Sequence, residues 1–224
     1  MSSVSPAAID VRQALIDSAY SLFLACGDVS AVTMRRVGQR AGVSAMAAYA
    51  HFANKDELLT VLVDRGFAQM LALMSSALMQ ENPVERLREV GRKVFQFGRQ
   101  YPQLYHLIFI RSKAGDTPDA NASTDWRGAA TYEFLATQVQ ACIDAGAITG
   151  VGAHALALTL WSATHGLLSM RISQRLWMPE EEFTRLFWTS LDLLMDKYLY
   201  APYAQINPHG AQLDMDQVFV PVQG

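Results

Sequence analysis

The chain has 224 residues, a formal net charge of −3 and a charged fraction of 17 %, which is low against about 25 % in an average soluble domain. The 51 % of hydrophobic residues exclude an intrinsically disordered chain. The excess of acidic residues (21) over basic residues (18) excludes a uniformly basic nucleic-acid binder. Two cysteines are too few for a disulfide scaffold, and residues 1–9 carry no signal-peptide pattern, so we expect a cytoplasmic protein.

Helical periodicity dominates the chain, and no alternating pattern of useful length predicts a strand. Most predicted helices follow a polar N-cap or begin with proline, both of which favour a helix start. In chain order, the predicted helices begin near residue 8, after Thr33, after Ser44, after Asn54, after Asn82, at Pro102, near residue 124, near residue 151 and near Pro179. Residues 114–123 are rich in loop formers, and the tail from residue 201 lacks a helical pattern.

The lengths of these elements predict an all-α protein of about nine helices in two domains. The first three helices are short and close together, which predicts an N-terminal three-helix bundle over residues 8–53. A larger helical domain is expected over residues 54–200, followed by an irregular tail over 201–224.

The shortage of charge is concentrated in residues 145–170, which contain no Asp, Glu, Lys or Arg. This length would suffice for a membrane span of about 20 residues, but its glycines, hydroxyl residues and histidines argue against one, as does the lack of an aromatic belt at both ends and of a flanking basic cluster. We expect instead a helix that is buried on nearly all sides and is covered on one face by a second subunit. His154 and His165 lie eleven residues apart with no carboxylate or cysteine between them, so no metal site is predicted.

Residues 33–52 form a short helix, a glycine turn and a second short capped helix, the pattern of a DNA-binding helix-turn-helix. This segment contains Arg35, Arg36 and Arg40 and no acidic residue, so it is locally +3 within an acidic chain. The pattern alone fits a DNA reader and an ordinary helical hairpin with a solvated basic face about equally well.

The amino-acid sequence over residues 14–62 resembles the DNA-binding domain of the TetR family of transcriptional repressors. The residues that carry the resemblance are Ala19, Leu22, Phe23, Gly27, Thr33, Val37, Ala41, Gly42, Val43, Ser44, Tyr49, His51, Phe52, Asn54, Lys55, Leu58 and Leu59. It implies an N-terminal DNA reader, a helical ligand-binding and dimerisation domain, and a homodimer on a double-stranded palindromic operator.

The resemblance implies a role for each matched position. Thr33 is expected to cap its helix and contact a phosphate, and Arg35 to contact either a guanine edge or a phosphate. The full set expected to contact DNA is Thr33, Arg35, Arg36, Ser44, Ala45, Met46, Ala47, Tyr49, His51 and Lys55. Without the resemblance, we would interpret His51 as a surface or packing histidine. The recognition helix departs from the family in its run of alanines, so apolar contact with thymine methyl groups and DNA shape must supply much of the readout.

Trp161, His165 and Gly166 lie on one face of the charge-free helix and resemble the Trp…His-Gly signature of one TetR subfamily. They are expected at the ligand pocket or the dimer contact, and His165 is equally explained as a hydrogen-bonded structural histidine. The resemblance implies an internal pocket for a lipophilic or aromatic ligand, although apolar faces of helices are ordinary core by default. The residues expected to line it are Met70, Met74, Tyr105, Phe109, Trp126, Tyr132, Trp161 and His165. The last two long helices are expected to pair with their copies through Leu158, Gly166, Leu167, Met170, Phe187, Leu191 and Leu194.

The leading interpretation is a ligand-responsive repressor without a cofactor, which is not an enzyme. Two alternatives stay open at this stage. One is a helical enzyme using His165, Glu133 and Arg111, although no nucleophile is placed beside a base. The other is a dimeric small-molecule carrier whose DNA reader is vestigial, which the alanine-rich recognition helix would suit.

Overall fold

The computed structural model describes residues 10–110 and 128–199. These residues form nine α-helices and no named strand, with a single antiparallel bridge between Ile148 and Leu199. The all-α fold is therefore confirmed. The predicted loop over 114–123, the pocket candidate Trp126, the enzyme candidate Arg111 and the tail over 201–224 lie outside the described residues.

The chain divides into two compact units, which are considered separately. The N-terminal unit comprises Met1–Gln69 and Arg99–Gly128, and the C-terminal unit comprises Met70–Gly98 and Ala129–Gly224. These boundaries, which follow the contacts within the chain, differ from the functional boundary expected between residues 53 and 54. That functional boundary stays a prediction. The long helix α4 (Lys55–Ser75) contributes residues to both units.

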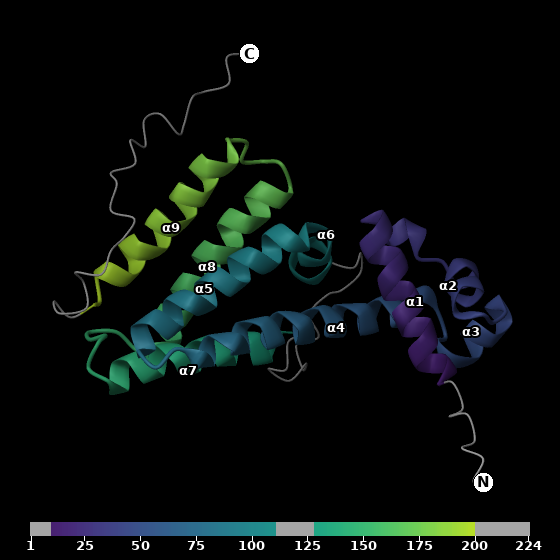
Figure 1. Ribbon diagram of the computed structural model, residues 1–224, viewed down its shortest axis with the longest axis horizontal. Helices are drawn as coiled ribbons and strands as arrows, with labels where there is room; N and C mark the ends of the chain where they lie inside the picture. The colour runs from purple at the N-terminus through teal and green to yellow at the C-terminus, as the bar shows by residue number, and fades with distance from the viewer. Residues whose placement is uncertain (1–9, 111–127, 200–224) are drawn as a thin grey trace, which may run out of the picture. The chain divides into compact units, whose positions relative to one another are not determined.

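The N-terminal unit is built on α1 (Val11–Cys26), α2 (Met34–Ala41) and α3 (Ala45–His51), together with the first part of α4 (Figure 1). Helix α1 begins at Asp10, whose carboxylate accepts a hydrogen bond from the Gln13 amide, and ends at Gly27, whose φ of 69° suits glycine. The core of the three-helix bundle consists of Leu15, Ala19, Phe23, Val37, Phe52, Leu58 and Leu62, which are all nearly or fully buried.

A second layer of the N-terminal unit comes from much later in the chain. Helix α6 (Pro102–Tyr105) continues into a π-helical turn, η3 (His106–Ile110). A short helix from Pro102 was predicted, but its π-helical end was not. Leu104 and Ile108 pack so closely against Gly66 of α4 that an added Cβ there would lie 2.8 Å from Ile108 Cγ2. This close approach explains why residues 99–110 belong with the N-terminal bundle in the division by contacts.

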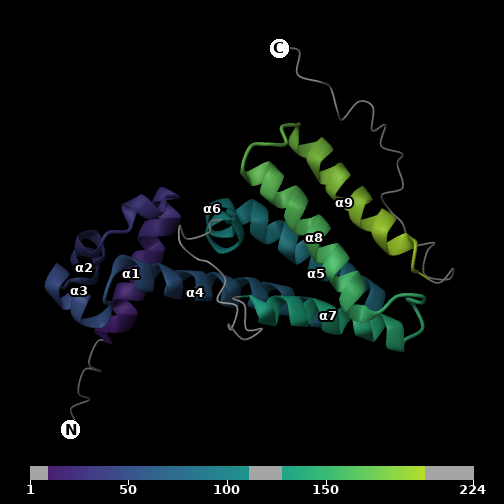
Figure 2. The same ribbon diagram turned by 180° about the vertical axis from the view of Figure 1, so that it is seen from behind.

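The C-terminal unit contains α5 (Pro83–Gln100), α7 (Ala129–Asp144), α8 (Ala153–Ile172) and α9 (Glu180–Asp196). Helix α8 packs against both α7 and α9 (Figure 2). The Asn82 carboxamide oxygen accepts hydrogen bonds from the amides of Val84 and Glu85, as expected for the N-cap of α5. Where α5 meets α9, the rings of Phe95 and Phe187 lie 4.5 Å apart and are buried in the core.

The charge-free helix is buried on one side only. Leu156, Leu160, Thr164 and Leu168 of α8 face the interior, whereas Leu158 is 55 % exposed and Met170 is also exposed. The expected burial on nearly all sides therefore depends on the second subunit, which stays a prediction. Among the described residues, the one stretch apolar and long enough to meet a length test for a membrane span is Lys55–Met79, and interior helices of globular proteins pass the same test.

Candidate DNA-reading surface and ligand cavity

Two side-chain caps and one glycine turn define the geometry of α2 and α3. Thr33 Oγ1 accepts a hydrogen bond from the Arg36 amide at 3.3 Å, and Ser44 Oγ accepts one from the Ala47 amide at 3.1 Å. In the turn between them, Gly42 has a φ of 75°, and the Val43 amide donates to the Gly38 carbonyl at 2.9 Å. A side chain at Gly38 would lie 3.0 Å from the carbonyl oxygens of both Val43 and Ser44, so glycine is required for this approach.

The predicted DNA-contacting residues fall into an exposed group and a half-buried group. Exposed are Thr33, Arg35, Arg36, Ser44, Met46, Tyr49 and His51, whereas Ala45, Ala47 and Lys55 are half-buried. Met46 is 83 % exposed, which is unusual for a large apolar side chain and leaves its thioether available to a partner. Ala48 faces inward and is fully buried, so the two sides of α3 are clearly distinguished.

Lys55 has a structural contact that sequence reasoning missed. Its ammonium donates to the Val29 carbonyl oxygen at 2.5 Å, which ties the start of α4 to the short 3-10 helix η1 (Val29–Ala31). The same helix start is capped reciprocally, because Asn54 accepts from the Glu57 amide at 2.9 Å and the Glu57 carboxylate accepts from the Ala53 amide at 2.7 Å. An ammonium has three donors, so this contact leaves capacity for a phosphate.

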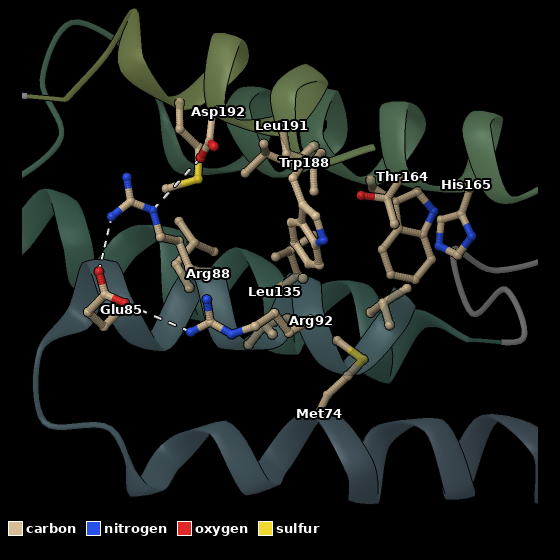
Figure 3. A pocket seen from close by; sticks show the side chains of 17 residues that line it. Met74, Glu85, Arg88, Arg92, Leu135, Thr164, His165, Trp188, Leu191 and Asp192 are labelled. Atoms are coloured by element: carbon tan, nitrogen blue, oxygen red, sulfur yellow. Dashed lines mark hydrogen bonds and ion pairs between the residues drawn. The ribbon is translucent and has the colours of Figure 1, made fainter. Parts of the chain in front are cut away.

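The C-terminal unit contains a partly open cavity of about 180 Å³ (Figure 3). Helices α5, α8 and α9 form most of its wall, while α4 contributes Met74 and α7 contributes Leu135. Its apolar lining comprises Met74, Leu87, Val90, Val94, Leu135, Leu160, Trp161, Trp188, Leu191 and Met195. A mostly apolar cavity with a few polar groups is typical of small-molecule sites.

Arg88 supplies a charged group at one end of the cavity. Its side chain is only 8 % exposed, and its Nη1 donates to Glu85 Oε1 at 3.0 Å. The Asp192 carboxylate of α9 lies 4.0 Å from Arg88 Nε. This distance allows an ion pair but is too long for a hydrogen bond. Within the part of the chain that is described, Arg88 Nε and Nη2 are buried and have no hydrogen-bond acceptor.

His165 lies at the other end of the cavity (Figure 3). Trp161 also lines the cavity, and its ring centroid lies 4.2 Å from that of His165. Burial lowers the pKa of His165 to about 3, because the charged imidazolium would lose its hydration there. His165 is therefore neutral at pH 7. Tyr132 contacts Trp161 edge-on at 5.9 Å from outside the lining, and its hydroxyl donates to the His154 carbonyl oxygen at 3.2 Å.

The structure brings together only part of the predicted pocket. Met74, Trp161 and His165 line the cavity, and Met70 is fully buried without lining it. Tyr105 and Phe109 belong to the N-terminal unit, where their rings lie 4.8 Å apart, so their assignment to the same lining is not supported by this cavity.

Sequence reasoning missed the polar end of the cavity and its aromatic side chain from α9, Trp188. One signal for Arg88 was available: it occupies the apolar face of α5 between Val84 and Gly91, where an arginine is unexpected. Asp192 likewise lies next to the apolar residue Leu191 on α9. Both Arg88 and Asp192 are buried.

The predicted dimer residues also separate by burial. Leu158, Gly166 and Met170 are exposed, and Leu167 and Leu194 are half-buried. Phe187 and Leu191 instead face the interior of the C-terminal unit, because the apolar stripe of α9 packs on α5. Leu193, which was not predicted, is 69 % exposed on the other side of α9.

Solved structures with the same fold cover most of this chain. A protein of unknown function from Rhodococcus sp. RHA1 is 20 % identical, with a TM-score of 0.69 over 87 % of this chain and 98 % of that one. SmeT, the repressor of the Stenotrophomonas maltophilia multidrug efflux pump SmeDEF, is 18 % identical, with a TM-score of 0.59 over 90 % and 96 %. RolR in complex with resorcinol is 12 % identical, with a TM-score of 0.57 over 87 % and 91 %.

Family models match both halves of the chain, whereas a comparison with curated protein sequences gave no significant match. Residues 15–62 match the model described as bacterial regulatory proteins, tetR family, and residues 87–194 match the tetracyclin repressor-like C-terminal domain. Together these matches span more than two thirds of the sequence. The chain therefore belongs to the TetR family of DNA-binding transcriptional regulators.

Proposed function

We propose that the protein is a homodimeric repressor that a lipophilic or aromatic small molecule releases from a palindromic operator. The observation that carries this proposal is the presence of an exposed helix-turn-helix and a mostly apolar cavity in one chain. Two neighbours of the same fold are described in complex with aromatic compounds, SmeT with triclosan and RolR with resorcinol. As a regulator of DNA it would act in the cytoplasm.

The exposed side chains of α2 and α3 support a mixed mode of DNA reading. Arg35 is exposed at the start of α2, where a guanidinium can reach a guanine edge or a phosphate. Met46 and Tyr49 offer apolar contact area from α3, which suits thymine methyl groups better than hydrogen-bonded readout. Lys55 combines its bond to Val29 with a contact to the DNA backbone.

The open faces of α8 and α9 support a dimer formed by these helices and their copies. Leu158, Met170 and Leu193 are large apolar side chains exposed to solvent in the single chain, and Gly166 permits close backbone approach. Two-fold symmetry would then place two copies of α3 about one DNA turn apart. Membership of the Trp…His-Gly subfamily, which is indicated by Trp161, His165 and Gly166, is likewise proposed.

The dimer is tested by Leu158→Asp, which places a charge on the proposed interface. The matched control is Leu78→Asp, because Leu78 is similarly exposed (52 %) but lies outside α8 and α9. Sedimentation should show a monomer for Leu158→Asp and a dimer for the control and the wild type. Dimeric Leu158→Asp would contradict the assignment of this surface.

Operator recognition is tested by genome-wide recovery of bound DNA, followed by titration of operator and scrambled DNA at several salt concentrations. Arg35→Ala should weaken operator binding more than scrambled DNA, since a good contact to a base contributes about 1–3 kcal/mol of discrimination. Arg175→Ala removes another exposed arginine, between α8 and α9, and should change the affinity for neither the operator nor scrambled DNA. Equal losses on both DNAs for Arg35→Ala would refute its role in base reading, and failure to recover any specific DNA would refute the repressor.

A further inference from the structure

The size of the cavity limits the ligand to one substituted ring. At about 180 Å³ it is only slightly larger than a cavity of about 150 Å³ that holds benzene. It is smaller than the roughly 300–1,000 Å³ of pockets that hold drug-sized ligands. A fused two-ring compound would therefore require the walls to move.

Because Gly91 has no side chain, two side chains of α9 pack closely against α5 at the wall of the cavity. A Cβ added there would lie 3.7 Å from Leu191 Cδ1 and 3.7 Å from Trp188 Cζ3, which is ordinary van der Waals contact. Gly91 therefore lies against Trp188 and Leu191, and a side chain larger than alanine at this position would push these two side chains into the space of a ligand. A flat ring is suited to the cavity because Trp188 contributes an aromatic side chain to its lining.

The buried guanidinium of Arg88 requires an acceptor. Burying N–H donors without acceptors is unfavourable, and here the donors Nε and Nη2 lack one among the described residues although the side chain is 92 % buried. Figure 3 shows Arg88 at the end of the cavity, between Glu85 and Asp192, with its aliphatic stem beside the apolar lining. A carbonyl or hydroxyl oxygen on a ligand would supply the acceptor.

The balance of charges argues against an anionic ligand. Glu85 pairs with Arg88 at 3.0 Å and with Arg92 at 3.8 Å, and Asp192 lies 4.0 Å from Arg88. The two arginines are thus balanced by two carboxylates within the lining itself. A ligand carboxylate would be attracted by Arg88 but repelled by Glu85 and Asp192 in a poorly hydrated site.

We propose that the effector is an uncharged compound with a single aromatic ring and one oxygen acceptor, which is bound by Arg88 while the ring lies against the apolar lining that includes Trp188. This inference rests on the proposed function in taking the cavity as the effector site. It goes further by assigning the size, the charge and the polar group of the ligand.

The test measures binding of four probes to the full chain without DNA, by calorimetry. Acetophenone has the ring and the acceptor, ethylbenzene lacks the acceptor, benzoate carries a negative charge and 2-acetylnaphthalene has a second ring. We expect acetophenone to bind about tenfold or more tightly than ethylbenzene, because the bond to Arg88 involves a charged donor. It should also bind more tightly than benzoate and 2-acetylnaphthalene.

Two variants show whether the cavity and Arg88 cause this preference. Arg88→Met should reduce the preference for acetophenone over ethylbenzene to about twofold or less, and Arg88→Met combined with Asp192→Met, which removes the buried ion pair as a whole, serves if Arg88→Met does not fold. Gly91→Leu should abolish binding of both probes. Arg175→Lys, at an exposed position outside the cavity, is the control and should change nothing.

The inference is overturned if no probe binds, if ethylbenzene binds as tightly as acetophenone, if benzoate or the two-ring probe binds best, or if a folded Arg88 variant keeps the preference. These results do not depend on DNA. A protein that shows the expected preferences but binds no operator would refute the proposed repressor and leave the ligand class standing. An operator complex that is released only by charged or two-ring compounds would refute the ligand class alone.

Discussion

Two glycines within helices should respond in opposite ways to the same substitution by alanine. Gly38 of α2 lies against the turn that precedes α3, and an alanine Cβ would lie 3.0 Å from the carbonyl oxygens of Val43 and Ser44. These neighbours are backbone atoms, which cannot rotate away as a side chain can. Gly91 of α5 faces only the side chains of Leu191 and Trp188, at 3.7 Å.

The magnitudes follow from two terms. Alanine within a helix is favoured over glycine by about 0.5–1 kcal/mol, and this term applies to both sites. Overpacking costs about 1–3 kcal/mol and applies only at Gly38, because 3.7 Å is a normal contact. We therefore expect Gly38→Ala to lower the free energy of unfolding by about 1–2 kcal/mol and Gly91→Ala to raise it by up to about 1 kcal/mol.

Urea denaturation followed by circular dichroism measures both changes, and operator titration adds a functional comparison. Gly38→Ala should also weaken operator binding, because α3 must shift away from α2 to admit the methyl group. Gly91→Ala should bind the operator as the wild type does in the absence of ligand. Unchanged stability in Gly38→Ala, or a loss of stability in Gly91→Ala, would refute this reasoning about the two contacts.

Three further predictions concern single side chains. The pKa of His165 is about 3 in the folded state and 6.5 ordinarily, so its contribution to stability is present above pH 6.5 and falls by about 2 kcal/mol at pH 5. Urea denaturation at pH 7 and pH 5 should show this loss in the wild type and not in His165→Gln. Equal losses in the two proteins would contradict the prediction. Burial raises the pKa of the Cys142 thiol to about 12, and the thiol donates to the Pro83 carbonyl oxygen at 3.2 Å. A chromogenic disulfide should therefore modify only the exposed Cys26 in the folded protein. Rapid reaction of both thiols would show that Cys142 is accessible. Ser44→Ala removes the cap of α3 and should lower the free energy of unfolding by about 1 kcal/mol, whereas no change in urea denaturation would mean that the hydrogen bond to Ala47 contributes nothing.

Local features of the fold were predictable because their causes are local. Thr33, Ser44 and Asn82 each cap the helix that the sequence assigned to them, since an N-cap depends only on the next few residues. The π-helical turn at His106–Ile110 was not predictable, because it depends on the packing against Gly66, about forty residues earlier.

The candidate site was predictable only in part, for the same physical reason. Helical periodicity shows that α9 has an apolar stripe but not whether that stripe meets α5 of the same chain or another subunit. Phe187 was therefore expected at the dimer surface although it packs on Phe95. The ion pair of Arg88 with Asp192 joins residues more than one hundred positions apart, and no local pattern connects them.

The central claim is that the cavity and the helix-turn-helix are energetically coupled, and titration of the operator in the presence of a cavity ligand tests it most directly. By reciprocity, a ligand that releases DNA must itself be bound more weakly by the operator complex. We predict that increasing acetophenone raises the apparent Kd of the wild-type protein for operator DNA, measured by fluorescence anisotropy, and leaves that of Gly91→Leu unchanged. Saturation of the cavity without any change in operator affinity would contradict the account.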